Sequence, residues 1–136
     1  MNSLRRYTLV LAIYLNARGL AFVLFEGPFS PFDWGLKETR CSRKHVRLLA
    51  RVRKLLDWYQ PDVLVIQDTS PQGTHRTRRV TSLNAAIVEL SSTRRIPIFR
   101  YSRLHVLEIF SAHAVPNKQA LAEIIATYIP AFERYV

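Results

Sequence analysis

PDVLVIQD, residues 61–68, is the stretch of this sequence that decides the fold. Pro61 and Asp62 lead into four consecutive apolar residues, and Gln67 and Asp68 close the run. A short apolar run between turn signals is typical of a strand that is buried on both faces. We expect the helix-like segments before and after it to cover those two faces. Because ligands gather beyond the carboxyl ends of strands in open α/β sheets, Gln67 and Asp68 mark the expected functional edge.

Three further strands are predicted before this stretch. Residues 7–15 (YTLVLAIYL) and residues 20–25 (LAFVLF) are rich in the branched and aromatic side chains that favour strands. The turn between them contains an asparagine and ends at Gly19, and both residue types can adopt positive φ. Residues 32–36 predict a shorter third strand. Three antiparallel strands therefore come first.

Helices and strands alternate in the rest of the chain. A helix is predicted at 42–59, with an apolar stripe formed by Leu48, Leu49, Val52, Leu55, Leu56 and Tyr59. A second helix is predicted at 77–90, with Val80, Leu83, Ile87 and Leu90 as its apolar positions. Residues 96–101 (IPIFRY) predict an edge strand, because a proline cannot donate to a sheet ladder. Two more helices are predicted, at 102–110 and from Asn117 to Pro130.

The order β-β-β-α-β-α-β-α-α predicts an α/β fold. Three antiparallel strands are followed by parallel strands in one mixed sheet, with helices on both faces. The best-known fold with this order is the RNase H-like fold. A chain of 136 residues suits one domain, residues 1–136.

The charge of the chain favours a polyanionic partner. Twenty Lys and Arg residues outnumber ten Asp and Glu residues, which gives a net charge of +10. Nucleic acid is the partner that such a surplus most often serves, with an anionic membrane surface second. One predicted helix concentrates this charge on the face formed by Lys44, Arg47, Arg51 and Lys54, and no acidic residue lies between Glu38 and Asp57. Because no acid neutralises it, we predict that this face contacts phosphate, and the plainer alternative is a solvated face.

A second basic cluster follows the strand at 61–68. It comprises His75, Arg76, Arg78 and Arg79, between a polar loop and the next helix. Guanidinium groups suit phosphate because they form two parallel hydrogen bonds to it. We therefore predict that this cluster contacts nucleic acid at the expected functional edge.

The cysteine content and the amino terminus suggest a cytoplasmic protein without a membrane partner. Cys41 is the only cysteine, so one chain can form neither a disulfide framework nor a cysteine-based zinc cluster. A basic start at 1–6 precedes an apolar run, as in signal peptides. No small-residue cleavage site follows, however, and the run is too short to span a bilayer. We interpret it as the first strand.

Several segments resemble the RuvC-like branch of the RNase H-like superfamily, the Holliday-junction resolvases and their relatives. LAIYLNARGLAFVLFEGP (11–28) resembles the opening hairpin of that family, and FDWGLKETR (32–40) resembles its third strand. YQPDVLVIQDTS (59–70) resembles the strand that bears a catalytic carboxylate. RIPIFRYSRLHVLEIF (95–110) and NKQALAEIIATYIP (117–130) resemble the following strand and helices. The last segment has Lys118 near its start, where the resemblance implies a contact to nucleic acid.

The resemblance implies an endodeoxyribonuclease of DNA recombination that uses Mg²⁺ or Mn²⁺ held by several carboxylates. This chain departs from that pattern. The first strand ends in Tyr14, Leu15 and Asn16 where the family has an acid, and Gln67 stands at the position of a second acid. By this resemblance we also expect the domain to lack the family's final acidic helix. Asp68 is the remaining candidate for a catalytic residue and metal ligand, although an Asp after a strand also begins turns well.

These departures favour a RuvC-like protein that binds branched or duplex DNA with little or no nuclease activity and without a required cofactor. An active metal-dependent Holliday-junction endonuclease is one alternative. A protein-interaction module without a nucleic-acid role is another. Members of the family are often dimers, so the resemblance also implies that a homodimer can form.

A few residues receive structural predictions instead. Glu26 and Asp33 are expected as solvated turn residues at hairpin ends, and Trp34 and Trp58 as core residues. His105 and His113 are too scattered to indicate a metal site.

Overall fold

A computed structural model describes residues 8–15, 18–27, 30–38, 44–68, 78–102, 119–120, 122–123, 125 and 129. The elements in chain order are β1 (Val10–Leu15), β2 (Gly19–Phe25), β3 (Pro31–Glu38), α1 (Lys44–Tyr59), β4 (Val63–Gln67), α2 (Arg78–Thr93) and β5 (Ile98–Tyr101). The predicted helix at 102–110 and most of the helix predicted from Asn117 to Pro130 lie outside the described residues. Within the described ranges, no helix is long and apolar enough to cross a membrane.

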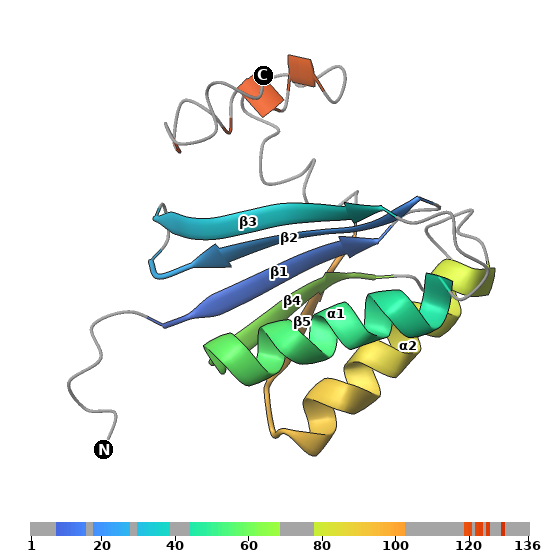
Figure 1. The fold of residues 1–136 in the computed structure, drawn as a ribbon. Coiled ribbons are helices and arrows are strands. Elements are labelled where there is room, and N and C mark those ends of the chain that lie inside the picture. The colour runs from blue at the N-terminus through green and yellow to red at the C-terminus, as the bar shows by residue number, and fades with distance from the viewer. Residues whose placement is uncertain are drawn as a thin grey trace.

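The five strands form one mixed sheet in the order β3-β2-β1-β4-β5 (Figure 1). β2 pairs antiparallel with β1 and β3, whereas β4 pairs parallel with β1 and β5. The predicted α/β mixed sheet is therefore confirmed. The strand at 61–68 lies beside the edge strand β5, and β1 takes the middle of the sheet.

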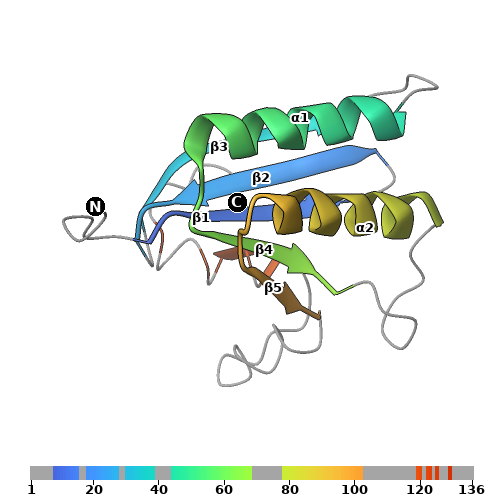
Figure 2. The same cartoon turned by 90° about the horizontal axis from the view of Figure 1, so that it is seen from below.

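α1 and α2 pack side by side on the same face of the sheet (Figures 1 and 2). The prediction that they cover opposite faces of β4 is therefore wrong. The chain moves along the sheet in the same direction from β3 to β4 as from β4 to β5. Because crossovers between parallel strands are right-handed, two crossovers in one direction place both helices on one side. The described helical residues after 118 lie on the other side of the sheet (Figure 1).

The hydrophobic core lies between the sheet and these two helices. The strands contribute Leu11, Ile13, Leu15, Leu20, Phe22, Leu24, Leu64 and Ile66. The helices contribute Leu48, Val52, Leu55, Leu56, Val80, Leu83 and Ile87, which confirms most of both predicted stripes. In β1, β2 and β4 the buried residues alternate with more exposed ones, so one face of the sheet is covered and the other is more open. We call the side opposite α1 and α2 the outer face.

Two structural predictions for single residues are wrong. Asp33 is a half-buried residue of β3 and not a solvated turn residue, because it accepts a hydrogen bond from the Tyr59 hydroxyl of α1. This hydrogen bond, together with burial and the Asp33 charge, raises the pKa of Tyr59. Trp58 is 77% exposed, because the buried stripe of α1 faces the sheet and Trp58 lies outside that stripe. Glu26 is exposed in the β2–β3 turn, and Trp34 is half-buried.

Gly19 is required by a close approach between strands. The sequence suggested positive φ there, but no described glycine adopts it. Gly19 instead pairs with Glu38, and a Cβ atom on Gly19 would overlap the Lys37 carbonyl oxygen. A backbone carbonyl held in a sheet ladder cannot move aside without breaking the pairing of β2 with β3.

We expect Gly19→Ala to lower the free energy of unfolding by about 3 kcal/mol, at the upper end of the cost of overpacking. Gly35→Ala is the matched control. A Cβ atom at Gly35 would lie 2.9 Å from the Phe22 ring, and a side chain can shift more easily than a backbone carbonyl. Urea denaturation of both variants measures the difference. Equal stability of Gly19→Ala and the wild type would contradict the close approach.

Candidate nucleic-acid interface

Three parallel strands have their carboxyl ends at the same end of the sheet. We call this row of strand ends the carboxyl edge. β1 ends at Leu15, β4 at Gln67 and β5 at Tyr101. α1 and α2 both begin at this same end of the molecule (Figure 2). In open α/β sheets, ligands bind at such an edge, so the structure brings the expected site residues and the two helix starts to the place where a ligand would bind.

Tyr14, Gln67 and Tyr101 share the outer face at this edge. Ile13 pairs with Ile66, and Gln67 pairs with Tyr101, so the three residues lie at neighbouring positions on β1, β4 and β5. Successive side chains of a strand point to opposite faces, and the buried Ile13 and Ile66 face the helices. Tyr14, Gln67 and Tyr101 therefore project away from the helices. The side chain of Tyr14 is 41% exposed and that of Tyr101 is 37% exposed.

The end of β4 is held from two directions. The backbone N–H of Asp68 donates to the Tyr101 carbonyl oxygen at 2.9 Å. The side-chain amide of Asn84, a buried residue of α2, donates to the Gln67 carbonyl oxygen at 3.3 Å. Sequence reasoning missed both Asn84 and Tyr101. A polar residue among the apolar positions of α2 was the one available signal for Asn84.

The side chains at the carboxyl edge do not fit a two-metal site. Mg²⁺ prefers anionic oxygen ligands and gives up its water molecules reluctantly. Tyr14 offers a phenol and Gln67 an amide, so of these neighbours only Asp68 offers a carboxylate. Among the described residues, no group of three His, Cys, Asp or Glu side chains is placed to hold a metal ion.

Arg78 and Arg79 are exposed in the first turn of α2. That turn contains no acidic residue, and cations at a helix N-terminus oppose the helix dipole. Among the described residues, neither arginine has an ion-pair partner in the structure. An anion bound at the carboxyl edge would therefore be attracted both by the two arginine charges and by the positive end of the α2 dipole.

The predicted basic face of α1 is only partly open. Arg47 and Lys54 are exposed. Arg51 is half-buried, and its guanidinium carbon lies 5.7 Å from the centre of the Phe22 ring. Packing on an aromatic ring competes with a phosphate contact, so Arg51 contributes less to the face than its spacing predicted. The side chain of Lys44, and all of His75, Arg76 and Lys118, lie outside the described residues.

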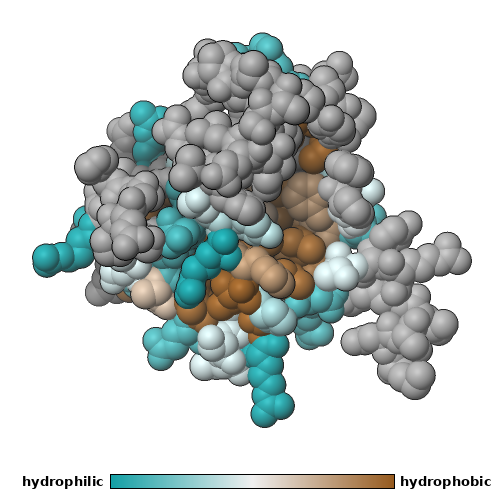
Figure 3. Space-filling view, turned by 180° about the vertical axis from the view of Figure 1, so that it is seen from behind, coloured by the Kyte–Doolittle hydropathy of each residue, from teal (hydrophilic) through white to brown (hydrophobic). Residues whose placement is uncertain are grey.

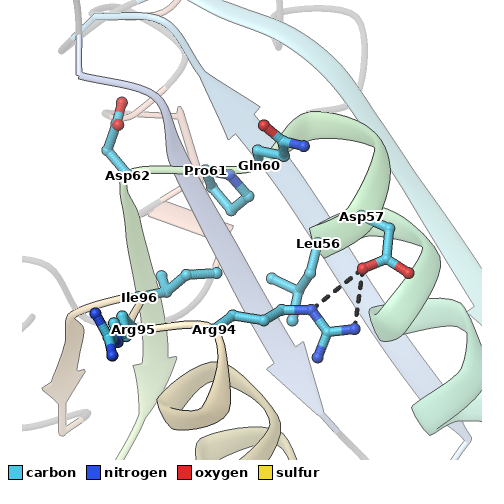
Figure 4. A pocket seen from close by; sticks show the side chains of 8 residues that line it. All are labelled: Leu56, Asp57, Gln60, Pro61, Asp62, Arg94, Arg95 and Ile96. Carbon is cyan, nitrogen blue, oxygen red and sulfur yellow. Dashed lines mark hydrogen bonds and ion pairs between the residues drawn. The ribbon is translucent and has the colours of Figure 1, made fainter. Parts of the chain in front are cut away.

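A pocket of about 590 Å³ lies at the opposite end of β4 (Figure 4). Its two acidic residues form contacts between different elements of the fold. Asp57 forms an ion pair with Arg94 at 2.9 Å, and Asp62 accepts a hydrogen bond from the Leu9 N–H at 2.8 Å. Gln60 and Arg95 follow the ends of α1 and α2 with φ of 45° and 58°, a conformation that terminates helices. The residues that line this pocket therefore connect the ends of α1 and α2 to the sheet.

No protein-family model matches the sequence, and no curated protein matches it. Solved structures do match. Thermus thermophilus RuvC has a TM-score of 0.71 at 15% identity, covering 90% of this chain and 80% of that protein. T. thermophilus RuvC in complex with a Holliday junction substrate has a TM-score of 0.73 at 14% identity, covering 91% and 81%. The yeast mitochondrial Holliday junction resolvase Ydc2 has a TM-score of 0.61 at 17% identity, covering 93% of this chain and 65% of Ydc2.

At these identities the likeness concerns the arrangement of the backbone. It extends over nine-tenths of this chain. The resemblance inferred from the sequence segments is thereby confirmed for the fold. This chain has a RuvC-like, RNase H-like fold.

Proposed function

We propose that this protein binds branched or duplex DNA at its carboxyl edge and has little or no nuclease activity. The observation that carries the proposal is the pair Tyr14 and Gln67. These residues occupy neighbouring positions on β1 and β4, where the resemblance places two catalytic acids. A phenol and an amide at these two positions would give a metal ion no negatively charged ligand, which supports a protein with little or no metal-dependent cleavage.

Charge and similarity support DNA as the partner. The chain carries a net charge of +10, and Arg47, Lys54, Arg78 and Arg79 are exposed on the helices that begin at the carboxyl edge. One of the similar structures is RuvC in complex with a Holliday junction substrate. His75, Arg76, Lys44, Arg51 and Lys118 remain proposed contacts, with Arg51 the weakest because it packs on Phe22.

Two other functions each have one observation in their favour. Asp68 follows β4 at the carboxyl edge, where an active endonuclease using Mg²⁺ or Mn²⁺ would need a ligand. Val46 and Trp58 are exposed on α1, which suits a protein-interaction module or a homodimer. We favour DNA binding because the exposed arginines gather at the same edge as Tyr14 and Gln67.

Binding to a four-way junction should depend steeply on salt. If about five phosphates are neutralised, the logarithm of the association constant should fall against the logarithm of salt concentration with a slope of about −4.5. Arg78→Ala with Arg79→Ala should reduce the slope by about two, because two phosphate contacts are lost. Fluorescence anisotropy between low and moderate salt measures both slopes.

Arg53→Ala is the control for this series, since it removes an exposed arginine of α1 that is not a proposed contact. Its slope should stay close to that of the wild type. Thermal midpoints of all variants should also stay close to the wild type, because Arg78 and Arg79 lie outside the core. An affinity that does not change with salt would overturn DNA binding as the function.

The wild-type chain should not cleave a four-way junction in Mg²⁺ or Mn²⁺. One carboxylate cannot hold two ions on both sides of a scissile phosphate. Gln67→Glu should not restore cleavage, because Tyr14 still supplies no charge on β1. A labelled junction on a denaturing gel tests both proteins. Nicking by the wild type that disappears with Asp68→Asn and with a chelator would favour the active endonuclease instead.

A further inference from the structure

We propose that the outer face at the carboxyl edge binds unpaired bases, with Tyr14 and Tyr101 as stacking platforms and Gln67 between them as a polar contact to a base edge. This inference rests on the proposed function, because it assumes that nucleic acid lies along the carboxyl edge. It goes beyond that function by naming the part of the nucleic acid that the edge would recognise.

The two tyrosines are far enough apart for each ring to stack on a different base. Tyr14 is on β1 and Tyr101 is on β5, with β4 between them and Gln67 at the same level. Neighbouring strands are about 4.8 Å apart, so the two tyrosines stand about 10 Å apart across the sheet. Exposed aromatic side chains on neighbouring strands are a common platform on which single-stranded nucleic acid stacks two or three bases.

Exposure of aromatic side chains continues along β5. Phe99 pairs with Val65, two positions before Tyr101, and therefore shares the outer face. It is 51% exposed. Seen from behind, the described surface shows hydrophobic residues gathered in the lower middle of the molecule, with hydrophilic residues beside and below them (Figure 3). Clustered hydrophobic exposure of this kind marks binding surfaces.

Charge complementarity selects nucleic acid over an apolar partner for this face. Arg78 and Arg79 lie at the same edge and carry the charge that suits a phosphate backbone. The Gln67 amide supplies one donor and one acceptor group, which matches the polar edge of a base. In a continuous duplex the base faces are stacked inside, whereas branch points and single strands expose them. The proposed ligand is therefore DNA with unpaired bases.

The test compares one oligonucleotide carrying 2-aminopurine in two forms, single-stranded and fully paired. The variant Tyr14→Leu with Tyr101→Leu keeps apolar side chains of similar bulk and removes both aromatic rings. We expect its affinity for the single strand to fall about 100-fold, or about tenfold for each lost stacking contact. Its affinity for the duplex and its salt slope should not change.

Phe32→Leu is the matched control, because Phe32 is also 41% exposed but lies at the start of β3, against the Tyr59 ring. It should bind both forms like the wild type. The wild type should also change the 2-aminopurine fluorescence of the single strand, and the double variant should not. Circular dichroism checks that all variants are folded.

The possible outcomes distinguish a failure of this inference from a failure of the proposed function. Salt-dependent binding that is unaffected by the loss of both tyrosines would overturn the stacking platform and leave DNA binding intact. Equal losses for the single strand and the duplex would also overturn it. An absence of salt-dependent binding to the single strand, the duplex and a four-way junction alike would overturn the proposed function itself.

Discussion

The parallel pairing of β4 with β1 and β5 is the constraint on which the rest of the structure depends. At the amino end, Asp62 and Leu9 exchange two hydrogen bonds of 2.8 Å, one of them through the Asp62 carboxylate. The Leu64 N–H then donates to the Pro97 carbonyl oxygen at 2.9 Å, and the Asp68 N–H donates to Tyr101 at 2.9 Å. Both ends of β4 are thus fixed to its neighbours. This pairing brings Tyr14, Gln67 and Tyr101, which are far apart in sequence, to one place.

In our proposal the carboxyl edge combines a RuvC-like backbone with side chains that do not suit metal-dependent cleavage. A fold positions residues, but the side chains at those positions decide what reaction can occur. A phenol and an amide at neighbouring positions on β1 and β4 cannot replace two carboxylates around a metal ion. They can replace them in contacts to nucleic acid, since a phenol ring stacks and an amide forms hydrogen bonds. The arginines at the start of α2 would supply positive charge for the proposed binding, with or without catalysis.

The sequence predicted the elements well because each one carries its own periodic pattern. The apolar run of β4 and the stripe of α1 both appear where the pattern placed them. The same patterns could not show which face of the sheet each helix would cover, because that depends on the direction of the crossovers. Nor could they show that Arg51 packs on Phe22. The spacing of residues predicts which face of a helix a residue lies on, but it does not predict which residue of another element it contacts.

The candidate site was predicted in part. Gln67 and Asp68 follow directly from the end of an apolar run, and Arg78 and Arg79 from the cluster that comes after it. Tyr101 was missed because its relation to Gln67 depends on strand register, which the sequence does not contain. Asp33 was wrongly predicted to be solvated because its hydrogen bond comes from Tyr59 of α1, and the sequence does not show which residues of α1 lie against β3.

The most direct test of the central claim is Mn²⁺ binding at the carboxyl edge, measured as paramagnetic broadening of backbone amide NMR signals. Wild-type protein is compared with a Tyr14→Asp, Gln67→Glu variant, which places two carboxylates on neighbouring strands next to Asp68. Mn²⁺ should selectively broaden signals around Ile13 and Asp68 in the variant and should leave the same signals unbroadened in the wild type. Selective broadening around Asp68 in the wild-type protein would contradict the claim that the edge has lost its metal site.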